Sequence, residues 1–344
     1  FFCQQNGNPM KNTTRIQYNA YASHIATLNG IDDATVKFSV EPTIEQKMED
    51  RIQESADFLK DINIVPVDDM SGEKIGLGID SPIASRTDTT SKDRSPRPVG
   101  DMTGKTYEAK KTDFDTYITY KQMDLWSKFP DFQARLRNKV IEQIARDRLM
   151  IGFNGTSAAV ETNIATNQLL QDVNIGWLQH LRNDANERVL SGIKVGAGGD
   201  FENMDAAVFD VTNELIDPWH RDDSELVAIT GRTLLSDKYL GLINANDKPT
   251  EKNALRTLMA NKTLGNLPGM GVPFFPTRGL LITKLSNLSI YWQSGSRRRQ
   301  IMDNPKRDRV EDFNSVNEAY VVEDFGACAF LDGILLPDGA GGWA

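Results

Sequence analysis

The sequence predicts an α+β protein with a separate α/β region after Met204. Short stretches of alternating apolar residues at 62–67 and 74–79, and a β-branched and aromatic stretch at 114–120, are typical of strands. A long amphipathic helix at 130–152 follows, and strands alternate with helices after Met204. With 344 residues, of which 39% are hydrophobic and 25% charged, the chain can form one or two ordinary cores.

Charge and composition exclude several classes of protein. The net charge of −9 argues against broad binding of nucleic acid, which needs a basic surface. No apolar run approaches the ~20 residues of a membrane span, and no secretory signal pattern opens the sequence. Cys3 and Cys328 are too few for a disulfide framework or a structural zinc site. We therefore expect a soluble protein without metal or cofactor. Residues 1–9 look foreign, because Met10 opens a stretch that resembles a natural start.

Two helices are expected at the amino-terminal end, at 14–30 and from Thr43 to about 59, joined by a polar segment at 32–38. Each begins with a threonine followed three residues later by a glutamine, which is the spacing of a capping box. Both carry a narrow apolar stripe on an otherwise polar surface. Helices of this kind are marginal alone, so we expect them to dock on a larger body.

The segment 62–120 predicts an arm that cannot bury itself. Its strand stretches are separated by Ser81 to Lys105, a polar region with almost nothing to pack. An isolated hairpin is marginal in water, and so long a structureless loop is rare inside a compact domain. We therefore expect this arm to lie on another copy of the same protein.

The helix at 130–152 is the best-defined element. Apolar residues recur every four positions, Pro130 suits a first turn, and ~20 residues give a length of roughly 30 Å. A further helix is expected at 173–190, before the glycine-rich segment 192–199. The remaining expected elements are helices at 206–216, 231–243 and 255–264, strands at 226–229, 280–283, 288–292, 320–322 and 327–331, and a loose tail at 337–344.

No catalytic motif is complete. The segment 100–106 resembles a phosphate-binding loop but has three residues between its glycines, where four are needed. Gly196 to Gly199 lacks the preceding strand of a dinucleotide site. Three histidines are scattered singly, and Cys328 lies in an apolar strand. Acidic residues are abundant, but nothing selects a catalytic pair. We expect no catalytic, cofactor or metal site.

One basic cluster occurs late in the chain, interleaved with acidic residues. A solvated edge is the simplest interpretation, a charge network across a subunit contact is the next, and contact with DNA is the third. The candidate inter-subunit network comprises Arg297, Arg298, Arg299, Asp303, Arg307, Arg309 and Glu311.

In its order of parts the chain resembles the major capsid proteins of tailed bacteriophages, which have the Hong Kong 97 fold, and more narrowly those of Peduovirus-type phages with contractile tails. The resemblance covers nearly all of 10–336. It rests on the stretches LNGID at 28–32, FSVEP at 38–42, INIVPV at 62–67, GFNG at 152–155, LQDV at 170–173, GWL at 176–178, GNLP at 265–268 and YVVED at 320–324.

This resemblance implies a division of the chain into named regions. They are a scaffolding-like amino-terminal segment at 10–38, an N-arm at 39–64, an extended β-hairpin loop at 65–120, a peripheral domain at 121–200 and 285–336 with a spine helix at 130–152, and an axial α/β domain at 201–284. Relatives often lose the first segment to a phage protease, and the matching position here is the joint between Phe38 and Ser39.

The implied function is self-assembly into pentamers and hexamers of an icosahedral head that encloses double-stranded DNA without reading its sequence. The protein would be made in the bacterial cytoplasm, reside in the virion, and meet scaffolding or protease, portal and decoration proteins. Two alternatives remain at this stage: an acidic α/β hydrolase with Ser81–Lys105 as its lid, and a tail or baseplate component.

Overall fold

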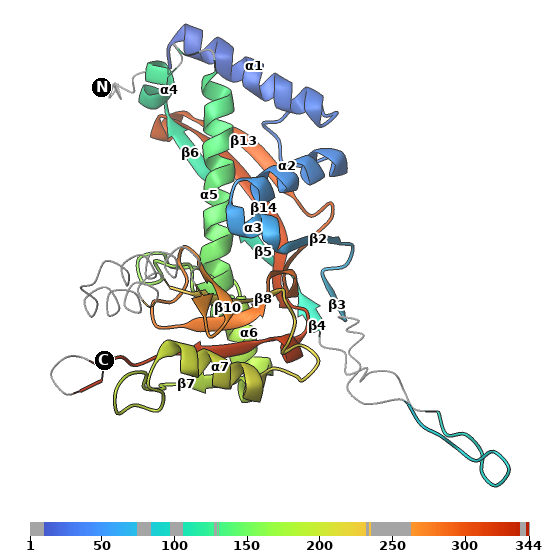
Figure 1. Ribbon diagram of the computed structural model, residues 1–344. Helices are drawn as coiled ribbons and strands as arrows, with labels where there is room; N and C mark the ends of the chain where they lie inside the picture. The colour runs from blue at the N-terminus through green and yellow to red at the C-terminus, as the bar shows by residue number, and fades with distance from the viewer. Residues whose placement is uncertain are drawn as a thin grey trace.

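The computed structural model describes residues 10–73, 84–96, 106–126, 129, 131–231, 234, 263–337 and 342–343, and the fold is that of these residues. Figure 1 shows a large sheet with a long helix beside it, and a second sheet beyond the carboxyl end of that helix. Several expectations lie outside the described residues: the foreign leader 1–9, the strand at 74–79, the phosphate-loop-like glycines, the helix at 231–243 and most of that at 255–264.

Seven helices have these bounds: α1 Asn12–Leu28, α2 Pro42–Glu54, α3 Asp57–Asp61, α4 Tyr120–Trp126, α5 Phe132–Asn154, α6 Trp177–Asp184 and α7 Met204–Leu215, all within the described residues. Four short 3-10 turns occur at Asn186–Arg188, Leu285–Asn287, Pro305–Arg307 and Phe325–Ala327. None of the helices in this part of the chain is long and apolar enough to cross a bilayer.

The large sheet has the strand order β1 (Phe38–Ser39), β13 (Arg298–Asn304), β14 (Arg309–Val322), β12 (Leu288–Gln293) and β2 (Asn63–Val67). Two further strands, β5 (Lys110–Asp113) and β6 (Thr116–Thr119), also pair with β14. The second sheet has the order β7 (Val189–Ser191), β15 (Ala329–Asp332), β11 (Leu280–Lys284), β8 (Leu226–Thr230), β10 (Leu267–Gly271) and β9 (Thr263–Leu264). A small ribbon joins β3 (Ser71–Glu73) to β4 (Thr106–Glu108).

Only the middle of the expected arm leaves the body. At one end, β2 pairs in parallel with β12, and at the other end β5 and β6 pair with β14. Residues 84–96 lie far from both sheets in Figure 1. The expectation that the whole of 62–120 is unsupported was therefore wrong at its two ends, because β12 and β14 offer hydrogen-bonding partners that a pattern within the segment cannot reveal.

The expected helices α1 and α5 are confirmed, but the helix expected from Thr43 to about 59 is divided into α2 and α3, because Ala56 has an extended backbone. The caps of α1 and α2 are not those expected. Thr14 donates to Asp124 of α4 (2.5 Å) and makes no capping box. For α2, the side chain of Glu41 accepts the amide of Ile44 at 3.1 Å. A glutamate before a proline at the first helical position serves as well as a threonine, because its carboxylate also favours the positive end of the helix dipole.

The main core forms where α5, α6 and the large sheet meet. Trp177 is fully buried, and its indole donates to the carbonyl of Ser289 at 2.9 Å. Its ring lies edge-on to Phe153 at 5.2 Å and to Tyr320 at 5.4 Å. The expected helix at 173–190 is shorter in the structure, because Gly176 is its N-cap and 189–191 forms β7 beside β15.

Two glycines allow this close packing. A Cβ on Gly176 would lie 2.3 Å from the carbonyl oxygen of Ile151, and a Cβ on Gly152 would lie 2.2 Å from the ring of Trp177. Both distances are shorter than real Cβ contacts, and the obstacle at Gly176 is backbone that cannot rotate away.

Replacement of Gly176 by alanine should therefore destabilise the subunit by about 1–3 kcal/mol, the usual cost of overpacking a core. Urea unfolding followed by tryptophan fluorescence measures this change. Gly295→Asn is the control, because Gly295 has φ +70°, which asparagine tolerates, and a Cβ there would meet nothing within 4 Å. Equal stability of the wild type and Gly176→Ala would contradict the packing described here.

Candidate functional site

The basic cluster lies on β13 and β14, two adjacent antiparallel strands in the middle of the large sheet. Arg299 is paired in register with Asn314, and Arg298 with Ser315. Sequence reasoning missed β13 and all but the end of β14, because their charged residues do not alternate with apolar ones. Many of these charges are tolerated because they contact partners from other elements, and those partners are distant in sequence.

Five charged side chains form a buried cluster between α2, α5 and the large sheet. They are Glu45 and Glu49 from α2, Arg148 from α5, Arg297 before β13, and Glu318 from β14. Each is at most 1% exposed. Arg148 donates to Glu49 at 2.7 Å and to Glu318 at 2.6 Å. Arg297 donates to the same Glu49. Glu49 therefore bridges two arginines, and α2 is joined to both α5 and the sheet.

Backbone and amide groups complete the buried cluster. Glu45 accepts the amide of Gly295 at 2.8 Å and that of Arg297 at 3.3 Å. Asn314 accepts from the Arg297 guanidinium at 3.1 Å. These contacts matter because a buried charge is tolerated only when it is both neutralised and hydrogen-bonded.

The two glutamates of α2 respond differently to burial. Burial would raise the pKa of Glu49, but the charges of Arg148 and Arg297 outweigh it and hold the pKa below its usual value. The pKa of Glu45 is raised by burial, against the opposing effects of the Gly295 amide and Arg297. Glu49 is thus the carboxylate whose charge the buried cluster needs.

A second set of polar contacts holds α1 on the body. Arg15 pairs with Asp303 of β13 at 2.5 Å, and the hydroxyl of Tyr120 donates to the same carboxylate. Arg299 donates to Asp312 at 2.6 Å and to the hydroxyl of Tyr21 at 3.1 Å. Two members of the candidate inter-subunit network, Asp303 and Arg299, therefore contact α1 of their own chain.

The other members of that network do not form one connected group, although Arg309 and Glu311 pair with each other. Arg297 is fully buried in its own subunit and offers no surface to a neighbour. Arg298 donates to Ser39 at 2.8 Å. Arg309 pairs with Glu311 at 2.6 Å and stacks over the ring of Tyr117 at 4.4 Å, whereas Arg307 is exposed. For the exposed members, a contact with a second subunit stays a prediction.

The joint between Phe38 and Ser39 lies at the edge of the large sheet. These two residues form β1, in which Phe38 pairs with Arg299 and Ser39 with Arg298. β1 ends the strand order, so its outer edge is not paired to any described strand. Phe38 is buried and Ser39 is exposed. The joint is thus extended, as protease substrates are, and one of its edges is open.

Two of the histidines and the cysteine considered for catalysis contact other side chains of the fold. His180 contacts Asp184 at 3.1 Å, and His220 contacts Asp324 at 3.0 Å. Burial raises the pKa of the Cys328 thiol to about 12, so it is not a ready nucleophile. Within the described residues, no group of histidine, cysteine and carboxylate side chains could hold a metal ion.

Loss of the Glu49 charge should leave Arg148 with Glu318 alone and Arg297 with no carboxylate nearer than Glu45, at 3.9 Å. We expect Glu49→Gln to destabilise the subunit by about 3–5 kcal/mol, the usual cost of breaking a buried ion pair. Glu142→Gln, on the surface of α5 and paired with Lys139 at 2.7 Å, is the matched control and should change stability by no more than about 0.5 kcal/mol. Chemical denaturation compares the two, and similar effects of both variants would disprove a special role for the buried cluster.

The amino-acid sequence is similar to a family of known proteins along most of its length. The family model described as phage major capsid protein, P2 family, matches residues 17–334. The chain is 46% identical to a protein of Escherichia phage P2 named "Capsid proteins". The alignment covers 96% of this chain and 96% of that protein. It is 40% identical to the major capsid protein of Serratia phage KSP20, with 94% of this chain and 97% of that protein covered.

Solved structures agree with this match. The structure of the satellite phage P4 procapsid including the size determination (Sid) protein contains a chain that is 43% identical, with a TM-score of 0.80 over 96% of this chain and 99% of that one. A capsid of an empty GTA particle has a TM-score of 0.50 at 17% identity, with 80% of this chain and 89% of that one covered, and supports the fold alone. The expectation of a tailed-phage capsid protein is confirmed, and the chain belongs to the P2 family of phage major capsid proteins.

Proposed function

We propose that the protein assembles into pentamers and hexamers that close into an icosahedral head shell around double-stranded DNA. The observation that carries this proposal is the segment 84–96, which stands away from a body that already pairs both of its flanking ends. The relatives give no support to the hydrolase with a long lid or to the tail component. We infer a structural rather than a catalytic role, within the virion.

The physical basis of assembly is contact area. Arms laid across neighbours create interfaces of obligate size, often above ~2,000 Å², and assembly then stabilises each subunit by mass action. Residues 84–96 suit such a contact because they are folded locally. Asp88 accepts the amide and hydroxyl of Thr90, at 3.0 and 2.5 Å. The segment is therefore ordered in part before it meets a neighbour.

We propose the following regions within one subunit: an N-arm at 39–64, an extended loop at 65–120, a spine helix at α5, and peripheral and axial domains divided near 201 and 285. The two sheets support the last division only approximately. β15 lies after residue 285 but pairs with β11, which lies before it. The axial sheet therefore includes strands from both sides of the boundary.

Removal of 10–38 during maturation is supported by the position of Phe38 and Ser39 in an edge strand. Cleavage there would detach α1 from α2, while the buried cluster keeps α2 in place. The partners implied by this step are a scaffolding protein or protease. Portal and decoration proteins are further expected partners, and synthesis in the host cytoplasm is part of the same proposal.

Replacement of 84–96 by a glycine and serine linker of equal length should abolish closed shells. It should leave the subunit folded, because the hydrogen bonds around Asp88 that order this segment are local and none of them reaches the body. Negative-stain microscopy measures the shells, and circular dichroism checks the fold. Shells formed at wild-type yield would rule out a bridging role for this segment.

Protein from mature particles should begin at Ser39 when its intact mass is measured. Protein expressed without phage partners should retain 10–38 and provides the control. A chain from mature particles that still starts at Met10 or earlier would refute the proposed removal, without affecting the assignment as a capsid protein.

A further inference from the structure

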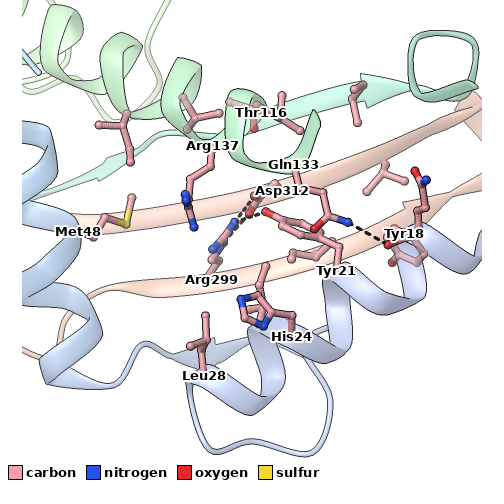
Figure 2. Close-up of a pocket in the computed structure, with 18 of the residues that line it drawn as sticks. Tyr18, Tyr21, His24, Leu28, Met48, Thr116, Gln133, Arg137, Arg299 and Asp312 are labelled. Atoms are coloured by element: carbon pink, nitrogen blue, oxygen red, sulfur yellow. Dashed lines mark hydrogen bonds and ion pairs between the residues drawn. The ribbon is translucent and has the colours of Figure 1, made fainter. Parts of the chain in front are cut away.

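A cavity lies between α1 and the body of the subunit. Its volume is about 440 Å³, and its walls come from α1, α2, α5 and the strands β6, β13 and β14. Figure 2 shows Tyr18, Tyr21 and Leu28 of α1 on one side, with Met48 and Arg137 on the others. The helix α1 is therefore held by polar contacts and by the buried side chains of Tyr18, Ile25 and Ala26, and a cavity remains between it and the body.

The wall of this cavity is apolar, with cationic groups at its edge. The apolar lining includes Ile25, Ile44, Met48, Leu136, Val140 and Ile301. The charged lining consists of four basic side chains, Lys47, Arg51, Arg137 and Arg299, and a single acidic one, Asp312. The cavity thus carries a formal charge of +3 in a chain whose net charge is −9.

One of these cations is already neutralised. Arg299 donates to both oxygens of Asp312, at 3.0 and 2.6 Å. Arg137 extends from α5 toward this pair in Figure 2, and its charge acts on the hydroxyl of Tyr21. Within the described residues, neither Arg137 nor Lys47 nor Arg51 forms an ion pair with a carboxylate. The excess positive charge is therefore available to a ligand.

We propose that this cavity binds amphipathic aliphatic carboxylates. The carboxylate would pair with Arg137, and the alkyl chain would lie against Met48, Val140 and Ile301. An apolar cavity with few polar groups at one edge is the usual form of a small-molecule site, and 440 Å³ is within the usual range of about 300–1,000 Å³. A guanidinium is the side chain best suited to a carboxylate, because it donates two parallel hydrogen bonds.

The size of the cavity favours a chain-like ligand over a protein segment. A helix is ~10–12 Å wide with its side chains and rises ~5.4 Å per turn, so the cavity has room for at most about one turn. A flexible alkyl chain needs no such width. Since the ligand would touch both α1 and the body, it binds the docked state of α1 and must stabilise that state by linkage.

Isothermal titration of the full-length subunit with octanoate, decanoate and dodecanoate, below their micellar concentrations, tests the site. Affinity should increase by about fourfold for each added methylene until the cavity is filled. Arg137→Gln should weaken dodecanoate binding by about 10- to 100-fold, because it removes a charge-assisted hydrogen bond. Val140→Trp should abolish binding by filling the cavity. Dodecanoate should also slow proteolysis of the wild-type chain between α1 and α2.

Two controls make the outcome decisive. Arg135→Gln removes a guanidinium of the same helix that pairs with Asp131 outside the cavity, and it should bind dodecanoate as the wild type does. Dodecylamine has the same chain with the opposite charge and should bind poorly. Equal binding of dodecylamine, or undiminished binding by Arg137→Gln, would overturn the proposal in favour of unspecific adsorption. Undiminished binding by a folded Val140→Trp would exclude this cavity as the site.

Discussion

The fold of this subunit depends on the neutralisation of two buried arginines, Arg148 and Arg297, in its interior. Glu49 bridges both of them, while Glu318 also pairs with Arg148 and Glu45 lies beside Arg297. Buried charges of either sign would be costly without these partners. Glu49, Arg148 and Arg297 come from α2, α5 and the residue before β13, so their pairing brings α2, the long helix and the large sheet together. Apolar packing alone would hold α2 less specifically, because its stripe is narrow.

This arrangement explains how one chain can be both rigid and extended. The buried cluster and the ring packing around Trp177 hold the body, whereas 84–96 is left outside with local hydrogen bonds. α1 is intermediate. It is held by polar contacts from Arg15, Tyr21 and Thr14 and by a separate small apolar cluster, so it can leave without disturbing the main core, which contains no residue of α1. Such a graded attachment would suit the removal of 10–38 proposed above.

The sequence predicted the elements whose signal is local. The periodicity of α5, the alternation in β2 and the apolar runs of β8, β11 and β12 were sufficient to locate them. The signal failed where partners are distant in sequence. β13 and most of β14 resembled a solvated charged edge in the sequence. Arg297, which precedes β13, pairs with Glu49, and the two residues are 248 positions apart. Arg148 of α5 pairs with the same Glu49 over 99 positions.

The same limit applies to the buried cluster. The basic cluster was noted first as a solvated edge and second as a candidate inter-subunit network. The sequence did not reveal the burial of Arg148, Glu45, Glu49 and Glu318, since single charges on helices and strands carry no signal of burial. The family was recognised from short stretches spread over the whole chain, and no single contact was needed for this recognition.

A reconstruction of the assembled particle at side-chain resolution tests the central claim most directly, because it shows the buried cluster and the extended segment together. The account predicts that Glu49 pairs with Arg148 and Arg297 of its own chain in every subunit, while residues 84–96 lie on a neighbouring subunit. A shell in which Arg297 pairs with a carboxylate of another subunit, or in which 84–96 touches only its own chain, would contradict it.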